Sequence, residues 1–450
     1  MNVRHLGSAH VARSMGKRDI GFSLLISPFF PPVLLYAAWK CKNFGHRHWL
    51  LTIFVVWYAV SLPIAYDPTG EGPDGVRHLL SVYTFYSDMT FHQFMSDSFE
   101  IVQFKGAPGS NDLFKHIVAY FAGSVIGVPE LFFPMVGIFY GYFFTGSMLI
   151  IFRNIYHRKL PWVIIFLCLC FFLTRNIESL QAVRNPTAGW VLIYGILRFQ
   201  ETKKLRYIAL MATTPLIHFS FLLLALPAFV FLAIGNKPMV YAIMFTLSSQ
   251  ISLVAPDVAV DFISQVDIGQ QKVIDRSDRD QADLDDRAKV IEQQMQGGTR
   301  LWRAYMVAGY QKIALDVLIY GLIFSGAYFS MNIFAKNILS NGLMMLIASN
   351  LLWFLGIAAG RFWGLGFLLV MAGFILWRLG TEFSIEKIIW DKAYILASYI
   401  SALLFFPYVI YYISKLMDFM TIFVFAFPWL TSIYPDIFSI KEMLRFVLPI

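Results

Sequence analysis

The stretch WLLTIFVVWYAVSLPIAY, residues 49–66, is apolar almost from end to end and decides the fold class. An α-helix needs ~20 apolar residues to cross the ~30 Å hydrocarbon layer of a membrane, and this stretch approaches that length. Comparable stretches recur at 131–152, 238–255 and 391–413. A large soluble protein with buried helices would need polar faces that these segments lack. The pattern therefore predicts an all-α polytopic membrane protein.

The composition agrees with a membrane protein and argues against other classes. Of the 450 residues, 58% are apolar, 17% aromatic and only 14% charged, whereas soluble proteins have about a quarter of their residues charged. The net charge of +8 comes from Lys and Arg in short connections. No basic patch interleaved with aromatic residues stands outside the apolar segments, so no nucleic-acid partner is expected. Cys41, Cys168 and Cys170 suggest neither a disulfide framework nor a zinc site.

We expect about eleven to thirteen membrane segments in a single domain covering residues 1–450. The first segment is interpreted as a retained helix rather than a cleaved signal peptide, because no small-residue cleavage site follows it. Pro215, His218 and Pro227 indicate broken or half-crossing helices in the region 206–235. The expected segments lie near residues 20–39, 49–66, 129–152, 160–176, 185–199, 206–218, 219–235, 238–255, 303–330, 340–358, 361–378, 391–413 and 416–434.

Basic residues in the short connections set the expected orientation. The connections 40–48, 153–159 and 198–206 contain three, three and four Lys or Arg residues, and they share one side if every segment crosses once. The positive-inside rule makes that side cytoplasmic. The basic N-terminal stretch then falls outside, unless the first segment, with its Pro31-Pro32 pair, does not fully cross.

Two long connections, 67–128 and 256–302, then face outward. In the first, residues 113–126 have helical periodicity but are too short to cross, so we expect an amphipathic helix on the outer membrane surface. In the second, the charged stretch 272–298 predicts a short external helix or hairpin. Its aspartates lack the spacing and the glycine of an EF-hand loop, so a solvated charged face is the preferred interpretation.

Ionisable residues at segment ends are the candidates for function, because burying charge in a membrane is costly. The loop AYDPTGEGPDGVRH, residues 65–78, contains Asp74, with Arg77 and His78 beside it. A carboxylate on such a Gly- and Pro-rich loop can act as a general base or bind a sugar hydroxyl. An ordinary surface turn is the alternative.

Arginines at two further segment ends are candidates for binding anions. Arg184 stands just ahead of Pro186, which fits the first turn of a new helix, and helix N-termini favour anions. Arg175 and Glu178 precede it, and they could equally pair with each other while Arg184 reaches lipid headgroups. Arg361 lies outward at the glycine-rich junction GIAAGRFWGLGF, where the positive-inside rule predicts few basic residues.

A single histidine, His218, stands in the apolar run TTPLIHFSF, residues 213–221. Most histidines in such places are packing residues with satisfied hydrogen bonds. His218 becomes a functional candidate because an imidazole titrates near neutral pH.

Together these features resemble the EpsG/Wzy-type family of bacterial exopolysaccharide and O-antigen polymerases, over roughly residues 20–380. The outer G-x-G-x-D-Y loop of that family is matched by GEGPDGVRH, with Asp74 at the acidic position. Its R-Q-x-I-A-like element is matched by AVRNPTAGW, with Arg184 at the arginine. Its A-x-x-F-H-x-S helix is matched loosely by ATTPLIHFSF with His218, and its outward arginine by Arg361.

The resemblance implies a membrane glycosyltransferase with a GT-C-like fold in the bacterial inner membrane. Such an enzyme joins oligosaccharide repeat units carried on undecaprenyl diphosphate at the periplasmic face, without a cofactor, a metal or a nucleotide sugar. Its partners would be that lipid-linked oligosaccharide, the bilayer, and chain-length regulator or export proteins. Arg184 and Arg361 would clamp the diphosphates, with Arg175 as a further ligand.

The same resemblance assigns roles to the remaining candidates. Asp74 would deprotonate the attacking sugar hydroxyl, and His218 is the second candidate for this role. Arg77, His78 and Glu178 would bind glycan.

Three other functions compete with the polymerase. A lipid-linked sugar flippase or another secondary transporter would have internal repeats and ionisable residues near mid-membrane, and we find no repeat between the two halves. Other GT-C-type lipid-linked sugar transferases usually have paired acids in the first outer loop, where Asp67 and Asp74 are too far apart. A membrane acyltransferase would need a histidine inside the membrane, for which His218 is the candidate.

Overall fold

The computed structural model describes residues 16–64, 74–103, 105–153, 155, 160–254, 301–352, 357–380, 388–433 and 439–447. The described residues are helical almost throughout and form no strand beyond an isolated bridge between Ala107 and Ser110, which confirms the predicted all-α class. The charged stretch 272–298 and residues 67–73 of the first outer connection lie outside the described residues.

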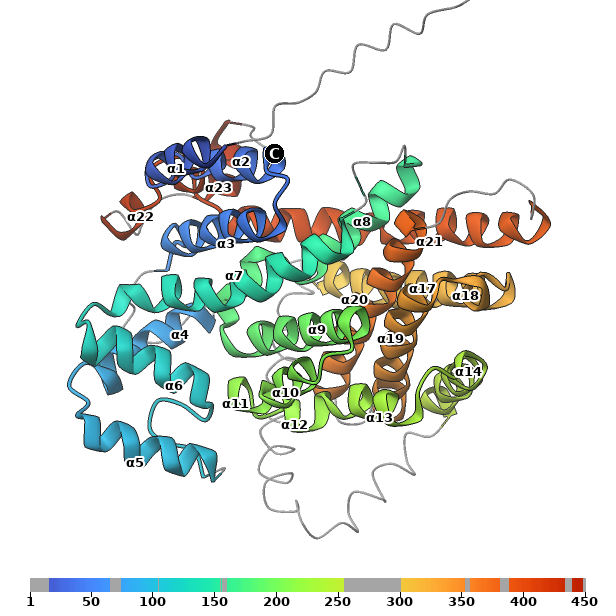
Figure 1. The fold of residues 1–450 in the computed structure, drawn as a ribbon, viewed down its shortest axis with the longest axis horizontal. Coiled ribbons are helices and arrows are strands. Elements are labelled where there is room, and N and C mark those ends of the chain that lie inside the picture. The colour runs from blue at the N-terminus through green and yellow to red at the C-terminus, as the bar shows by residue number, and fades with distance from the viewer. Residues whose placement is uncertain are drawn as a thin grey trace, which may run out of the picture.

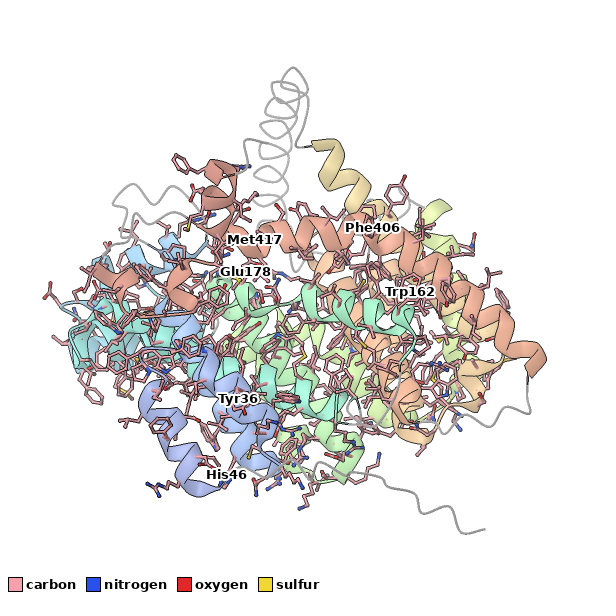
Figure 2. All side chains as sticks on the ribbon, turned by 90° about the horizontal axis from the view of Figure 1, so that it is seen from above. Tyr36, His46, Trp162, Glu178, Phe406 and Met417 are labelled. Atoms are coloured by element: carbon pink, nitrogen blue, oxygen red, sulfur yellow. The ribbon has the colours of Figure 1, made fainter. Side chains whose placement is uncertain are left out.

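Four helices of the described chain are apolar and long enough to cross a membrane, judged by length and composition: Pro129–Ile151, Trp162–Ala182, Ala359–Gly380 and Ala393–Asp418. The outward faces of the helices carry large apolar side chains. On the last of the four, Leu403 is 75% exposed and Phe406, labelled in Figure 2, is 55% exposed. Lipid accommodates such a surface and water does not, so the structure supports a helical membrane protein.

The first half of the chain is built around three helices that run side by side. α3 (Phe44–Val60) packs on α7 (Phe132–Ile151), and α7 packs on α9 (Arg184–Thr202), as Figure 1 shows. The other elements of this half are α1 (Lys17–Ile26), α2 (Pro32–Lys40), α4 (Asp74–Ser81), the π-helical turn η1 (Val82–Tyr86), α5 (Phe91–Val102), α6 (Leu113–Tyr120), the π-helical turn η2 (Phe121–Val125), the 3-10 turn η3 (Pro129–Leu131), α8 (Trp162–Thr174) and the 3-10 turn η5 (Ile177–Ala182).

The second half is centred on α19 (Ile333–Leu351) and α20 (Ile357–Gly380), which pack closely. A Cβ atom at Gly373 would lie 2.7 Å from the backbone nitrogen of Leu339, so the missing side chain lets the two backbones approach. The other elements are α10 (Arg206–Ala212), α11 (Thr214–Ile217), α12 (Phe221–Leu224), α13 (Leu226–Ile234), α14 (Pro238–Val254), α17 (Leu301–Phe324), α18 (Ala327–Ser330), α21 (Ile388–Asp418), the 3-10 turn η7 (Ile422–Val424), α22 (Leu430–Ile433) and α23 (Ile440–Val447).

Several expected segments are not single helices. Residues 303–330 form α17 and α18, with a break at Ser325 and Gly326. Residues 20–39 form α1 and α2 with a break at Ser27–Pro31, and each is too short to cross ~30 Å alone. The expected segment 416–434 is wrong. α21 continues to Asp418, and the short elements η7 and α22 follow, because Pro428 and the positive φ of Phe427 (57°) prevent a continuous helix there.

The broken region was expected, and the structure confirms it. Residues 206–235 form the four short helices α10 to α13, with His218 in the break between α11 and α12. The periodic stretch 113–126 is also helical, as α6 and η2, and it carries an exposed apolar stripe at Ile117, Phe121 and Val125.

The basic connections approach one another at one end of the helices. Arg153, just after α7, donates to Glu201 near the end of α9 at 2.7 Å. His48, near the start of α3, lies 2.6 Å from the carbonyl oxygen of Tyr142 on α7. The first residue of α9, Arg184, is at the opposite end of that 19-residue helix, about 26 Å from Glu201 at 1.5 Å per residue.

Candidate functional site

A buried carboxylate joins three distant parts of the chain. Asp112 is 2% exposed and immediately precedes α6. Its Oδ2 atom accepts a hydrogen bond from Nη1 of Arg184 at 2.7 Å and lies 3.1 Å from Nδ1 of His218. Its Oδ1 atom accepts from the backbone N–H of Phe219 at 2.7 Å. Both oxygens are therefore held by donors, as a buried charge requires.

The turn between α5 and α6 fixes the position of Asp112. The backbone N–H of Asp112 donates to Oγ of Ser110 at 3.1 Å, and that hydroxyl donates to the carbonyl oxygen of Asp112 at 2.9 Å. Ala107 and Ser110 exchange two backbone hydrogen bonds across the turn. An acidic residue before the first turn of α6 also interacts favourably with the helix dipole.

The partners of Asp112 determine its charge. Burial alone raises the pKa of Asp112, but the hydrogen bond from His218, the positive charge of Arg184 and the N–H of Phe219 together hold this pKa below its ordinary value. Asp112 is therefore ionised at neutral pH. In the described ranges no three His, Cys, Asp or Glu side chains gather as metal ligands.

Arg184 begins α9 after an unusual backbone conformation. Val183 is buried, with φ 50° and ψ −73°. A positive φ is a genuine outlier for a β-branched residue and costs about 1–3 kcal/mol, which the surrounding packing must offset. Strain of this kind clusters at functional sites, and here it sets the start of the helix that carries Arg184. The Arg184 side chain remains 32% exposed, so it reaches from Asp112 toward solvent.

His218 presents one ring nitrogen to Asp112, and its other ring nitrogen forms no hydrogen bond with the described residues. Because Nδ1 faces a carboxylate, we assign the ring proton to Nδ1, which leaves a lone pair on Nε2. Nε2 is buried and has no hydrogen-bond partner within the described residues. A histidine oriented by a carboxylate, with a free Nε2, is the arrangement that takes a proton from a hydroxyl.

Two more arginines lie in the same region. Arg361, on α20, is close enough to both His218 and Arg175 to act on them electrostatically. Nη1 of Arg175 donates to the carbonyl oxygen of Asn185 at 3.4 Å. A Cβ atom at Gly189 on α9 would lie only 2.3 Å from that nitrogen, so glycine there leaves space for the guanidinium. The three arginines selected from the sequence are thus brought together, although they are far apart in the chain.

Lys115 adds to this positive region, and His78 lies within reach of its charges. Lys115 is 6% exposed, and its Nζ donates to the carbonyl oxygen of Gly109 at 2.7 Å. Burial, followed by the charge of Arg184, lowers the pKa of Lys115 to about 8. Burial, followed by the charges of Lys115, Arg184 and Arg77, lowers the pKa of His78 well below its ordinary value. The cations outnumber the single carboxylate of Asp112, which favours a multiply charged anion as ligand.

Asp74 and Arg77 lie apart from the buried charges. Asp74 is the first residue of α4, and its carboxylate pairs with Arg77 at 3.3 Å. Their side chains are 58% and 63% exposed, respectively, so the pair faces solvent. His78, on the same helix, is buried and points the other way, with its ring centroid 6.5 Å from that of Phe132.

Glu178 belongs to a second polar cluster on the other side of Arg175. Its Oε1 atom accepts from Nε2 of Gln181 at 2.8 Å and lies 3.5 Å from Nζ of Lys415. Arg175 and Glu178 both act electrostatically on Tyr412. Glu178 therefore neighbours the arginines without contacting Asp112.

Sequence reasoning missed Asp112 and Lys115. Asp112 stands immediately before the periodic stretch LFKHIVAY, where an acidic residue commonly caps a helix, so its place at a helix start was detectable. Its pairing with Arg184 and His218 was not, because these contacts span 72 and 106 positions of the chain.

We expect binding of inorganic pyrophosphate to weaken as pH rises through about 8, because Lys115 loses its charge there. Below that pH the cation of Lys115 adds to the attraction of the arginines, and above it only the arginines remain. Lys115→Met should remove this part of the pH dependence while binding persists. The affinities of the wild-type protein and of Lys115→Met are measured by calorimetric titration across this pH range. Pyrophosphate ionises in the same way in both titrations, so the difference between the two pH profiles reports Lys115 alone. Parallel pH profiles for the two proteins would contradict the assignment.

Comparison of the chain with protein-family models, curated proteins and solved structures found no match in any of the three.

Proposed function

We propose that this chain is a membrane glycosyltransferase that polymerises oligosaccharide repeat units linked to undecaprenyl diphosphate, as an exopolysaccharide or O-antigen polymerase. The observation that carries the proposal is the Asp112–His218 pair, with its free Nε2, beside Arg184 and Arg361. A base next to concentrated positive charge suits the transfer of a sugar from a diphosphate to a hydroxyl. The sequence resemblance points to the same chemistry.

The chemical step follows from these groups. Nε2 of His218 takes the proton of the acceptor hydroxyl as its oxygen attacks the anomeric carbon of the donor sugar. The bond between that carbon and the diphosphate oxygen breaks, and its electron pair leaves with the diphosphate. Arg184, Arg361 and Arg175 stabilise the growing negative charge. Asp112 orients the imidazole and stabilises its protonated form.

His218 replaces Asp74 as the proposed base. The Asp74 carboxylate is exposed to solvent and paired with Arg77, whereas His218 stands beside the arginines that would hold the leaving group. We keep Asp74 and Arg77 as candidates for contacting the glycan at the surface. His78 remains a candidate on the buried side of the same helix.

The proposed location is the bacterial inner membrane, with the site facing the periplasm. The basic connections lie at the far end of α9 from Arg184, and the positive-inside rule makes that end cytoplasmic. The break between α1 and α2 agrees with a first segment that does not cross the membrane. In that case the proposal puts the basic N-terminal stretch on the cytoplasmic side, with the other basic connections. The proposal includes a polytopic, GT-C-like arrangement in which further helices cross the membrane beside the four long apolar ones. It also includes partner proteins that regulate chain length or export.

A flippase or transporter is the second candidate, and one observation favours it. The tip of the α5–α6 hairpin and the break between α11 and α12 meet at the Asp112–His218 contact. Transporters bind substrate where discontinuous helices of this kind meet. A glycan ladder from cells lacking the gene separates the two functions. Without a polymerase single repeat units persist at the surface, whereas without a flippase no outward units appear.

Arg361→Gln should lower polymer formation on the order of 10²-fold, because a preorganised cation at the leaving diphosphate is lost. The readout is the glycan ladder of a deletion strain carrying the variant, with membrane content of the protein measured alongside. Arg153→Gln is the matched control, since Arg153 is a half-exposed arginine at the opposite end of the helices. A normal long-chain ladder from Arg361→Gln would contradict the proposal that Arg361 binds the leaving diphosphate.

A further inference from the structure

A set of buried polar groups surrounds Glu178 and is left incomplete by the protein. Tyr58 on α3 is 1% exposed, and Gln181 on η5 is 7% exposed. The hydroxyl of Tyr58 and Oε1 of Gln181 form no hydrogen bond with any described residue. An unsatisfied buried polar group costs stability, so two beside one carboxylate need an explanation.

These groups come from four elements and lie around one point. Glu178 and Gln181 are one turn apart on η5 and share a 2.8 Å hydrogen bond. Tyr58 is close enough to Glu178 to interact with it electrostatically, and it also interacts with Tyr140 on α7. Lys415, on α21, lies 3.5 Å from Glu178 and is 44% exposed, which connects the cluster to the surface. Figure 2 labels Glu178 near Met417, two residues beyond Lys415.

The charges of this cluster select the kind of ligand. A cation is disfavoured because Lys415 and Arg175 lie beside Glu178. An anion is disfavoured by the carboxylate of Glu178 itself. What remains is a neutral ligand that both donates and accepts hydrogen bonds, as the Tyr58 hydroxyl and the Gln181 carbonyl require.

Aromatic faces beside the cluster favour a sugar over a smaller polar molecule. The partly buried ring of Tyr412 packs on the fully buried Tyr408, with centroids 4.4 Å apart, and the exposed Tyr411 lies 5.2 Å from Tyr412. Tyr412 also interacts electrostatically with Glu178 and Arg175. Sugar rings present apolar C–H faces to aromatic side chains and hydroxyls to polar ones, and tyrosine offers both kinds of surface.

We propose that Tyr58, Glu178 and Gln181, with Lys415 at the entrance, form a binding subsite for a neutral sugar ring. This inference rests on the proposed function and specifies its glycan site. Arg175 stands between this cluster and the other arginines, so a sugar bound here has its diphosphate within reach of the cationic region. The subsite is separate from the residues that bind the diphosphate and from the proposed base.

The test uses the full-length protein in lipid nanodiscs and two probes. One probe is the phosphate-free oligosaccharide repeat released from the surface polysaccharide of the source cells, and the other is inorganic pyrophosphate. Tyr58→Phe should weaken binding of the oligosaccharide about tenfold, as expected for the loss of one buried hydrogen bond to a ligand, and leave pyrophosphate binding unchanged. Gln181→Met should act in the same direction. Tyr328→Phe is the matched control, because Tyr328 is fully buried and its hydroxyl is 2.7 Å from Oγ of Ser340.

The outcomes separate the subsite from the polymerase function. If Tyr58→Phe binds the oligosaccharide as tightly as the wild-type protein, the subsite proposal is wrong. The Tyr58 hydroxyl would then form its hydrogen bond with a bound water molecule. A wild-type protein that binds pyrophosphate but no oligosaccharide also overturns the subsite proposal. Suppose that the protein makes no polymer but binds the oligosaccharide, and that Tyr58→Phe weakens this binding. That result supports the subsite and rejects the proposed polymerase function. Tyr58→Phe should melt no lower than wild type, since it removes only an unpartnered hydroxyl.

Discussion

Asp112→Asn should leave the protein folded and lower polymer formation by about 10³- to 10⁴-fold. An asparagine amide can donate to Nδ1 of His218, which moves the ring proton to Nε2 and removes the base. In serine proteases the equivalent change produces the wrong tautomer and a loss of about 10⁴. Asp112→Ala should lower stability as well, by an amount toward the lower end of about 3–5 kcal/mol, because its partner Arg184 is one-third exposed.

Polymer length on gels and thermal melting of the purified protein separate the two effects of Asp112. Glu100→Gln is the control, since Glu100 is an exposed acid on the neighbouring helix α5. It should change neither quantity. If Asp112→Asn melts normally and still makes polymer at the wild-type rate, Asp112 does not orient a catalytic histidine.

His218→Asn should slow the chemical step by about 10²- to 10⁴-fold. The asparagine amide sits close to the position of Nδ1 and can still donate to Asp112, so the contact between the two broken regions persists while Nε2 is gone. Binding of pyrophosphate should therefore remain, because the arginines are unchanged. His218→Ala removes both nitrogens and should weaken folding as well.

Single-turnover transfer between lipid-linked repeat units measures the His218 effect directly. His92→Asn on α5 is the matched control, because this histidine is exposed and outside the site. The role of His218 is refuted by a variant that transfers sugar at the wild-type rate. A variant that loses pyrophosphate binding would show instead that His218 supports the structure of the cationic region.

Much of the helix pattern follows from local sequence. The start of α9 at Arg184 was predictable from Pro186, since proline favours the first turn of a helix. The breaks after Ile26, at Thr213 and at Ala225 each lie within two residues of a proline, which interrupts helices in any environment. The break at His218 has no proline beside it. The segment 416–434 was predicted wrongly because apolarity alone does not reveal where a long helix such as α21 will end.

The site is a tertiary feature, and its residues were only partly predictable. Arg175, Arg184 and Arg361 could be selected singly, because arginines at apolar segment ends are unusual. Their approach to one another depends on the packing of α9 near α20 and on Gly189, whose missing side chain leaves space for the Arg175 guanidinium. A loop rich in glycine and proline favours Asp74 as the base, but composition does not show that its carboxylate faces solvent.

Reconstitution of the purified protein in vesicles tests polymerase activity most directly. The vesicles contain only undecaprenyl-diphosphate-linked repeat units, with no nucleotide sugar, and products are resolved by length on a gel. We predict chains of several repeat units together with released undecaprenyl diphosphate, and no product from His218→Asn. Repeat units that cross the vesicle membrane but remain single would contradict the polymerase and establish the transporter in its place.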